Sequence, residues 1–269
     1  GANGRIMEKG IQISSIVLTY NEEDNIARCL DSLKQVADEM IVVDSFSSDR
    51  TEEICDAYGV KFIQHKYINH IEQKQYAATL VSHDYILMLD ADECLTDELI
   101  EKIKEIKKGP DADGYYINRF NKYCSRWIRH CGYYPDKKIR LWNRHKADIK
   151  GTNPHEKVVM HDDATVKRLN LDILHYAYES VDEHLRQMYN YAEITARAKY
   201  KSGEKANFLI HVLIGPMFKF VKKYIFQWGF LDGYYGFVFC ASESSVNFFK
   251  YLKLYEYNRK GFPGDQKPR

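Results

Sequence analysis

The sequence is poor in the residues that organise small secreted or fibrous proteins. Its 269 residues include only 6 prolines and 6 cysteines, and no two cysteines form a C-x-x-C pair. We therefore expect buried, reduced thiols rather than a metal site or a disulfide framework, although Cys124 and Cys131 are close enough in sequence to close a hairpin. With 45% apolar and 29% charged residues, a disordered or collagen-like chain is excluded.

Long apolar runs and an excess of one charge are also missing. No run of about 18 apolar residues occurs, so no segment is obliged to span a bilayer. The first ten residues, GANGRIMEKG, have no apolar signal core, and we expect an intracellular chain. A net charge of +1 argues against a protein that binds nucleic acid through bulk electrostatics.

The first hundred residues alternate between apolar, β-branched runs and segments with helical periodicity. The runs predict strands at 11–20, 40–44, 61–65 and 85–89, and helices after Asn21 and at 49–58, 71–81 and 97–107. Strand and helix alternate four times, and the short connections leave room only for helical crossovers between parallel strands. The pattern therefore predicts an α/β fold with a mostly parallel, doubly wound sheet and helices on both faces.

The pattern changes after Pro110. Residues 113–123 and 133–143 predict strands of a mixed or antiparallel extension, and Lys150–Glu156 reads as a polar loop. Ser180–Glu183 is a capping box that opens a helix to about Lys201, and most of the remainder is helical. We divide the chain into an N-terminal tail at 1–10, an α/β domain at 11–178, a helical C-terminal region at 179–258 and a flexible tail at 259–269.

Two carboxylates follow the most apolar of the predicted strands. Asp90-Ala91-Asp92 comes directly after YILML, and in an extended stretch residues i and i+2 project to the same side. Two carboxylates that close repel each other unless a cation lies between them, and Mg²⁺ or Mn²⁺ prefers such oxygen ligands. We interpret Asp90 and Asp92 as a metal site, with surface or capping acids as the alternative.

The same edge of the sheet carries further polar residues. Ligands of doubly wound sheets bind beyond the carboxyl ends of the strands, where Thr19, Asn21 and Glu22 follow the first strand and Asp44 ends the second. The first three could instead cap and charge the first turn of a helix. Asp44 could cap the next helix, but Ser48 and Asp49 already serve that need, which leaves Asp44 free to accept hydrogen bonds.

Four motifs in order carry a resemblance to a known family. They are T-Y-N-E at 19–22, V-V-D-S-F-S-S-D-R-T at 42–51, Lys74-Gln75 and D-A-D at 90–92. Together they resemble the family 2 glycosyltransferases with the GT-A fold, over about residues 13–156, and Lys74 lies at the family's usual distance before the D-x-D. The sequence departs from the family pattern at Leu18, Ser45 and Phe46. Ser45 replaces a second acid that normally contacts the ribose.

The resemblance implies a role for each of these residues. Residues 11–178 would form a nucleotide-sugar transferase domain in which Thr19, Asn21, Glu22 and Asp44 hold the uracil and ribose of a UDP-sugar. Lys74 would lie near the nucleotide, and Asp92, assisted by Asp90, would bind the Mg²⁺ or Mn²⁺ that bridges the diphosphate. An acceptor hydroxyl would then attack the anomeric carbon with inversion.

That attack requires a general base, because a sugar hydroxyl is a very weak acid at neutral pH. Pro154-His155-Glu156 is the strongest candidate, with Glu156 as the base and His155 orienting it or contacting the diphosphate; an exposed loop acid is the alternative. Arg140 is suited to bidentate phosphate contact, or is a strand arginine that snorkels to solvent. His175 reads more readily as a satisfied core residue than as a ligand.

The motifs G-x-x-P-H-E, H-Y and G-F-L-D-G narrow the resemblance to one subgroup. They resemble the bacterial lipopolysaccharide core β-1,4-glucosyltransferases, which implies transfer of glucose to a lipid-linked or lipopolysaccharide-core glycan at the cytoplasmic face of the inner membrane. Other surface-polysaccharide or polyprenyl-phosphate glycosyltransferases are the alternatives within the family.

The C-terminal third is rich in aromatic residues and lysines. Between Phe208 and Tyr257, 16 of 50 residues are aromatic, with Lys219, Lys222 and Lys223 among them. Gly215-Pro216 and Gly229 are expected to divide this stretch into short helices. This composition is typical of an interfacial membrane anchor. Helices that pack on the catalytic domain or on a second subunit are the alternative, and single-stranded nucleic acid is disfavoured by the balanced charge.

Two rivals come from other classes. A metal-dependent phosphatase or nucleotidyltransferase also uses D-x-D acids after an apolar strand, but a phosphatase would carry its nucleophilic Asp on the first strand, with Thr or Val two residues past the second acid. Here the acids follow the fourth strand, and Cys94 occupies that position. A membrane-associated scaffold that keeps the fold without turnover would bind neither UDP nor Mn²⁺.

Overall fold

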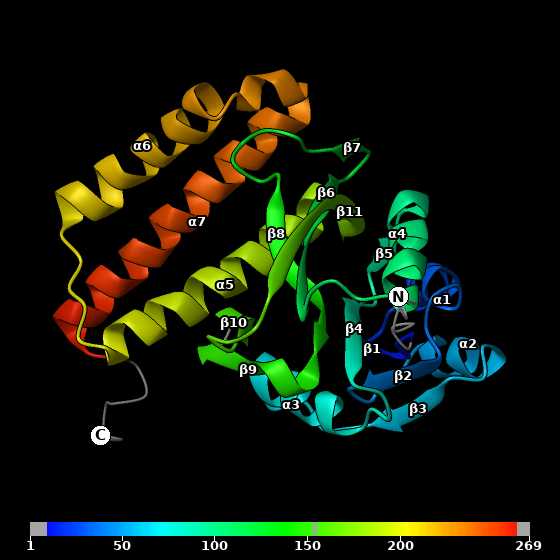
Figure 1. Cartoon of the computed structure of the whole chain (residues 1–269). Helices are drawn as coiled ribbons and strands as arrows, with labels where there is room; N and C mark the ends of the chain where they lie inside the picture. The colour runs from blue at the N-terminus through cyan, green and yellow to red at the C-terminus, as the bar shows by residue number, and fades with distance from the viewer. Residues whose placement is uncertain (1–9, 153–154, 263–269) are drawn as a thin grey trace, which may run out of the picture. The chain divides into compact units, whose positions relative to one another are not determined.

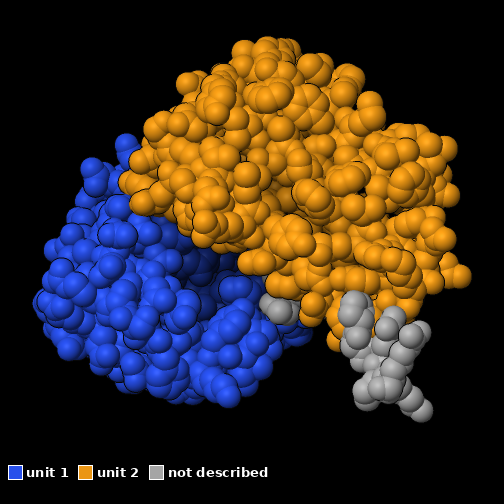
Figure 2. Space-filling view, turned by 180° about the vertical axis from the view of Figure 1, so that it is seen from behind, with its two compact units in different colours: residues 1–120, 136–175 blue, residues 121–135, 176–269 orange. Residues whose placement is uncertain are grey.

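The computed structural model describes residues 10–152 and 155–262 and divides into two compact units (Figure 2). The first unit comprises residues 1–120 and 136–175, and the second comprises residues 121–135 and 176–269. The first holds most of a mixed sheet. The second is largely helical.

Four parallel strands form one half of the sheet, as the sequence predicts (Figure 1). The strands are β1 (Ile13–Thr19), β2 (Glu39–Asp44), β3 (Lys61–Gln64) and β4 (Tyr85–Asp90). Thr19 pairs with Asp44 and Leu18 with Asp90, so the three strand ends meet at one edge of the sheet. The register thus gathers the predicted polar residues along this edge.

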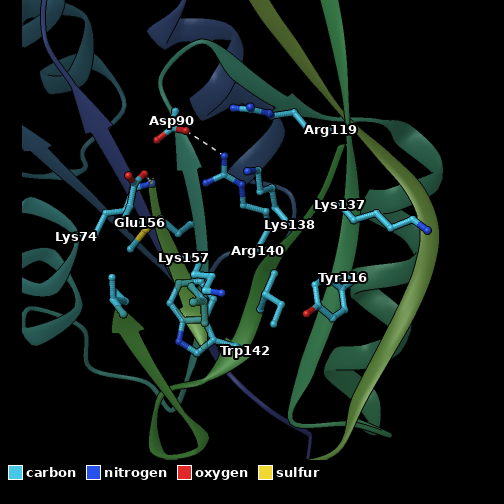
Figure 3. A pocket seen from close by; sticks show the side chains of 14 residues that line it. Lys74, Asp90, Tyr116, Arg119, Lys137, Lys138, Arg140, Trp142, Glu156 and Lys157 are labelled. Carbon is cyan, nitrogen blue, oxygen red and sulfur yellow. Dashed lines mark hydrogen bonds and ion pairs between the residues drawn. The ribbon is translucent and has the colours of Figure 1, made fainter. Parts of the chain in front are cut away.

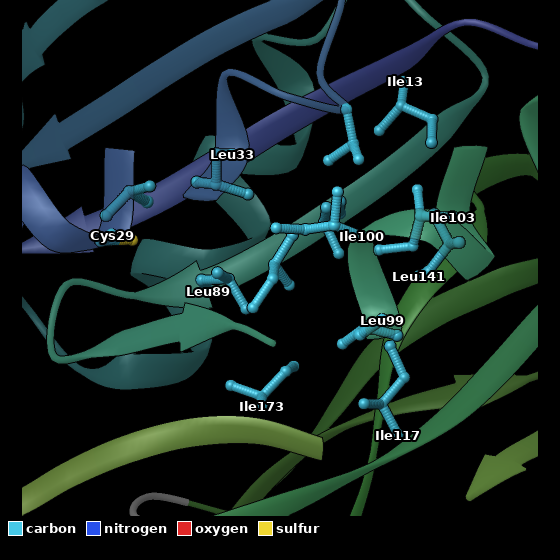
Figure 4. Close-up of a cluster of buried hydrophobic side chains, with 14 of the residues drawn as sticks. Ile13, Cys29, Leu33, Leu89, Leu99, Ile100, Ile103, Ile117, Leu141 and Ile173 are labelled. Carbon is cyan, nitrogen blue, oxygen red and sulfur yellow. The ribbon is translucent and has the colours of Figure 1, made fainter. Parts of the chain in front are cut away.

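Helices cover both faces of this sheet. The helices are α1 (Ile26–Leu33), α2 (Thr51–Ala57), α3 (His70–Thr79) and α4 (Asp97–Lys108). Helices α1 and α4 bury Leu33 and Ile103 against one face, where Ile13 and Leu89 point (Figure 4). Helix α3 packs Ala77 on the opposite face. The α/β fold class predicted from the alternation is therefore confirmed.

The first helix begins later than its cap signal suggests. The chain turns after Asn21, and α1 starts at Ile26 with Asn25 before it, so Asn21 does not cap this helix. Asn21 instead has φ of +53° and bonds to the neighbouring loop. The cap at Thr96 is confirmed, because its hydroxyl accepts a bond from the N–H of Leu99.

The other half of the sheet is antiparallel. Its strands are β5 (Glu93–Leu95), β6 (Gly114–Tyr123), β7 (Arg126–Trp127), β8 (Asp136–Asn143) and β11 (Val166–Tyr178). Strand β8 joins the two halves by pairing with β4 and with β6, both antiparallel. The strand order across the sheet is β3-β2-β1-β4-β8-β6-β11-β5. A 3₁₀ turn at 144–146 then leads to a hairpin of β9 (Ala147–Thr152) and β10 (His155–Met160). The predicted loop at 150–156 is therefore mostly strand, and Glu156 lies near the start of β10.

The second unit packs long helices side by side (Figure 1). They are α5 (Val181–Lys201), α6 (Gly215–Val221) and α7 (Gly233–Lys260). A π-helix at 208–214 and another at 222–226 extend α6 in both directions. The prediction that Gly215-Pro216 divides this segment is therefore wrong. Ser180 caps α5 as expected, accepting from the N–H of Glu183. No helix among the described residues is long and apolar enough to cross a membrane.

The G-F-L-D-G motif shapes the tip of this unit. The buried carboxylate of Asp232 accepts bonds from the backbone N–H groups of Arg129 and His130 and pairs with the His130 ring at 3.1 Å. A Cβ on Gly236 would lie 2.1 Å from the carbonyl oxygen of Gly229, so only glycine fits there. All six cysteines are free, and all but Cys124, which is half-buried, are buried as predicted.

Candidate functional site

A cavity of about 510 Å³ opens in the first unit beside the carboxyl end of β4 (Figure 3). Helix α3 and strands β4, β6, β8, β9 and β10 contribute side chains to it. Four predicted site residues from distant parts of the chain line it together: Lys74, Asp90, Arg140 and Glu156. Tertiary folding thus unites three of the nucleotide-sugar candidates with the candidate base.

Lys74 and Glu156 form an ion pair inside this cavity. The Lys74 ammonium nitrogen lies 2.7 Å from Glu156 Oε1, and both side chains are less than 15% exposed. Burial alone would raise the pKa of Glu156, but the charge of Lys74 outweighs it and holds that pKa below its ordinary value. Glu156 is therefore ionised at neutral pH, as a proton acceptor must be.

Asp90 is held by Arg140 and Glu93. Arg140 Nη2 donates to Asp90 Oδ2 at 3.0 Å and also to Glu93 Oε1, while Glu93 Oε2 accepts from the backbone N–H of Asp90 at 3.0 Å. Burial would raise the pKa of Asp90, but the charges of Lys74, Arg140 and Arg119 lower it further than burial raises it. Because Arg140 is 7% exposed, it does not snorkel to solvent.

Asp92 points to a different partner. Strand β4 ends at Asp90 and residues 91–92 form a turn, so the premise that both acids share an extended stretch is wrong. Asp92 Oδ2 lies 3.1 Å from Nε2 of His175, which is 12% exposed. The sequence did not connect His175 with Asp92, because 83 positions separate them.

Four predicted site residues carry a buried polar atom with no hydrogen-bond partner among the described residues. These atoms are Thr19 Oγ1, Asp92 Oδ1, Arg140 Nε and Glu156 Oε2. An unsatisfied buried polar group costs about 1–3 kcal/mol, so folded proteins rarely keep one without a ligand, ion or water to satisfy it. Three further atoms of this kind, in Glu72, His184 and Thr195, lie in residues that were not predicted for the site, so four of the seven fall on predicted site residues, where a polar ligand would satisfy them.

The described residues contain no group of three or more His, Cys, Asp or Glu side chains placed to hold a metal ion. Such a group is not required for Mg²⁺ or Mn²⁺ bound with its substrate, since these ions take one or two carboxylates and complete their shell with water and phosphate oxygens. The unpartnered Asp92 Oδ1 is a suitable ligand, and Asp90 supplies a second carboxylate nearby in the chain. Carboxylate oxygens are thus the right chemistry for a hard divalent cation, but Asp90 and Asp92 face different partners, Arg140 and His175.

The remaining predicted donor contacts lie at the ends of β1 and β2. Asp44 ends β2 as expected, but it is fully buried, and its two oxygens accept from the backbone N–H and the hydroxyl of Ser47. The expectation that Asp44 is left free is thus not met in this structure. The reason is a tight turn at Phe46, where φ is +63°, which folds Ser47 back over the carboxylate.

Asn21 and Glu22 connect the same two loops. Asn21 Oδ1 accepts from the N–H of Ser48 at 2.8 Å, and the N–H of Glu22 donates to the hydroxyl of Thr51 at 2.9 Å. Gln75, which follows Lys74, instead donates to the carbonyl of Ile149 on β9. The loops are therefore pre-ordered by bonds that run between them.

Several residues that line the cavity or lie behind it escaped the sequence analysis. Glu93 follows the D-x-D directly and is 1% exposed, and Arg119 lies 3.6 Å from it. Lys138 and Lys157 also line the cavity. A buried carboxylate next to D-x-D was a usable signal, whereas nothing local marks the basic residues of β6 and β8. The His155 side chain and Pro154 lie outside the described residues.

Comparisons with known proteins identify the family of this chain. The model of glycosyl transferase family 2 matches residues 14–166. A glycosyltransferase of Rickettsia felis is 32% identical over 268 residues, covering 93% of this chain and 90% of its own. The lipopolysaccharide core biosynthesis glycosyltransferase LpsC of Rhizobium meliloti is 24% identical over 258 residues, covering 91% and 93%.

Among solved structures, glucosyl-3-phosphoglycerate synthase of Mycobacterium tuberculosis, crystallised with Mn²⁺, UDP and glucosyl-3-phosphoglycerate, is 23% identical. It aligns with a TM-score of 0.35 over 42% of this chain and 45% of its own.

The chain belongs to glycosyl transferase family 2. It is therefore an enzyme, a hexosyltransferase with the GT-A fold that the motifs predicted. The rival assignments as a D-x-D phosphatase, a nucleotidyltransferase or a non-catalytic scaffold are not supported.

Proposed function

We propose that the protein transfers glucose, with inversion, from UDP-glucose to a hydroxyl of a lipid-linked or lipopolysaccharide-core glycan. The observation that carries this proposal is the shared cavity of Lys74, Asp90, Arg140 and Glu156, in which acidic groups stand beside basic ones. A nucleotide-sugar transferase needs both, because the diphosphate requires cationic contacts and the acceptor hydroxyl requires a base.

The donor is proposed to bind along the ends of β1, β2 and β4. Thr19 and Asp44 are the buried polar groups at this edge, and Asn21 and Glu22 lie on the loop that follows β1. A uracil base would replace Ser47 as a hydrogen-bond donor to the Asp44 carboxylate. Lys74 and Arg140 are proposed to face the diphosphate, where the Arg140 Nε is available as a donor.

Mg²⁺ or Mn²⁺ is proposed as the cofactor, held by Asp92 with help from Asp90. Bound there, it would neutralise the negative charge of the departing UDP. Arg140, which also donates to Glu93, keeps the Asp90 carboxylate in place, and His175 does the same for Asp92. Residues that hold a metal ligand in place by hydrogen bonds strengthen metal binding at other sites.

Glu156 is proposed as the general base. Its carboxylate takes the proton of the acceptor hydroxyl while the hydroxyl oxygen forms the new bond to the anomeric carbon. The bond from that carbon to the diphosphate oxygen breaks, and its electron pair leaves with UDP. His155, next to Glu156 in the chain, is proposed to assist this step.

The acceptor and the location rest on the relatives. LpsC is named for lipopolysaccharide core biosynthesis and is similar over nearly the whole chain. A lipid-linked acceptor places the reaction where nucleotide sugars and membrane lipids meet, which we propose is the cytoplasmic face of the inner membrane.

A screen of donor hydrolysis tests this proposal. The purified protein is incubated with UDP-, GDP- and dTDP-sugars, each with Mg²⁺, with Mn²⁺ and with a chelator. We expect release of UDP from UDP-glucose only when a divalent ion is present. Preferential turnover of a GDP- or dTDP-sugar, or full turnover in chelator, would contradict the proposed donor or the proposed metal.

Removing Lys74 is expected to shift the pH profile of transfer. In Lys74→Met, the cation that lowers the pKa of Glu156 is gone while burial still raises it, so the base protonates at higher pH. The acid limb of kcat/KM should therefore move to higher pH, measured with saturating acceptor. Lys157→Met, which changes a cavity lysine with no ion pair among the described residues, should leave that limb in place.

A further inference from the structure

The segment 208–226 in the second unit is apolar on both of its sides. Its inner side packs on α7 through Val212, Pro216, Phe220 and Tyr224. Its outer side presents the apolar residues at 209–210, 213–214, 217–218, 221 and 225–226, which are 42–71% exposed. We name these outer residues the apolar ridge. A contiguous exposed apolar surface of this kind on a folded protein usually marks a site that binds a partner or a membrane.

The ridge continues into an aromatic turn. Trp228, in the left-handed conformation with φ of +58°, is 59% exposed, and Phe230, Leu231 and Tyr234 follow it at 42–71%. Trp and Tyr favour the boundary between lipid and water, because their rings are apolar while the N–H and O–H groups can still bond to water or headgroups.

The charges around the ridge are of one sign. Residues 205–231 contain four lysines and no Asp or Glu. Lys219 and Lys223 pair with Glu243 of α7, at 3.1 and 3.6 Å, and so anchor the segment from its inner side. Lys205 and Lys222 are exposed and form no ion pair within the described part of the chain. An apolar strip flanked by free lysines complements a surface of acyl chains and anionic headgroups.

A second copy of the chain fits this surface less well. In a two-fold dimer the same patch meets itself, so the lysines of both copies would approach one another without an acid between them. An anionic bilayer avoids that repulsion.

We propose that the apolar ridge and the aromatic turn bind the interfacial region of an anionic lipid bilayer, with the segment lying in the membrane plane. The inner side is already occupied by α7, which leaves one face for lipid. This inference rests on the proposed function only for the lipid-linked nature of the acceptor; the surface itself is a property of the second unit.

Vesicle flotation of the full chain tests the proposal. Vesicles of phosphatidylcholine alone are compared with vesicles of phosphatidylcholine and phosphatidylglycerol in equal amounts. We expect the wild type to float with the mixed vesicles and much less with phosphatidylcholine alone. The variant Met217→Ser/Phe218→Ser/Phe226→Ser changes three side chains that are 64–71% exposed. Its partitioning onto the mixed vesicles should fall by about 10-fold or more.

Charge and control variants separate the contributions. Lys205→Gln/Lys222→Gln should weaken binding to the mixed vesicles by about five-fold per lysine and leave binding to phosphatidylcholine unchanged. The control Leu185→Ser/Ile194→Ser changes two exposed apolar residues of α5 and should float as the wild type does. Circular dichroism and thermal melting identify any variant that fails to fold.

The outcomes that overturn the proposal are distinct from failure of the proposed function. The proposal would be overturned if the wild type floats with neither kind of vesicle, or if the ridge variant floats as well as the wild type. The proposal would also be overturned if the wild type is a dimer in sedimentation analysis and does not float with vesicles, while the ridge variant is a monomer. The ridge would then be a subunit interface. Hydrolysis of UDP-glucose by the same preparations without vesicles reports on the proposed function separately.

Discussion

Glu156→Gln is expected to lower the rate of sugar transfer by about 10²–10⁴-fold while the protein still binds UDP-glucose. Glutamine keeps the size of the side chain but cannot take the acceptor proton. The ion pair with Lys74 is also lost, so the fold is checked by thermal melting. Transfer is measured by product formation and donor binding by calorimetry, because a base affects kcat much more than donor affinity.

A matched control makes the result specific. Glu101→Gln on α4 removes a carboxylate that is 71% exposed and that, within the described part of the chain, forms an ion pair only with Lys104. It should transfer sugar at the wild-type rate. A Glu156→Gln enzyme that also transfers normally would remove Glu156 from the mechanism. The base would then have to be sought among other residues around the cavity.

Asp92→Asn is expected to weaken the metal-dependent binding of UDP by more than about 100-fold. Loss of a residue that only hydrogen-bonds to a metal ligand already lowers metal affinity by about 10–100-fold, and loss of a direct ligand should exceed the upper end of that range. Asparagine preserves shape, so the turn after β4 should survive. Calorimetric titration of UDP with and without Mn²⁺ measures the effect, and circular dichroism monitors the fold.

Asp84→Asn provides the comparison, since Asp84 precedes the same strand that Asp92 follows and its side chain is 65% exposed. Its affinity for UDP with Mn²⁺ should equal that of the wild type. If Asp92→Asn binds UDP with wild-type affinity in Mn²⁺ and loses as much affinity as the wild type when Mn²⁺ is removed, then Asp92 is not the metal ligand. The orphaned Oδ1 of Asp92 would then need another explanation.

The parts of this protein that follow from local patterns were predictable. Alternating apolar strands and amphipathic helices with caps such as Thr96 reflect interactions within a few residues, and they predicted the parallel sheet. Because parallel strands end at one edge, the motifs after β1, β2 and β4 also had to meet there. The family resemblance came from these same short motifs and is confirmed.

Local patterns predicted less about conformations that depend on neighbouring loops. Asn21 looked like a helix cap and Asp44 like a free acceptor, yet each bonds to the loop that contains Ser47 and Ser48. The continuous segment through Gly215-Pro216 looked like two short helices. Asn21 is held by a loop 27 positions away, whereas Asp44 is held by a tight turn that brings back a residue only three positions further on.

The charge pairs at the centre of the site depended on the folded chain. Lys74 and Glu156 are 82 positions apart, and Arg140 reaches Asp90 across 50. No periodicity encodes such distances, because an ion pair depends on where two strands or a helix and a strand come together. Similarly, the sequence showed that 208–226 is rich in aromatics and lysines, but only packing on α7 distinguished the covered side from the exposed ridge. Short-range periodicity determines which elements form, whereas burial and pairing of charges are properties of the assembled fold.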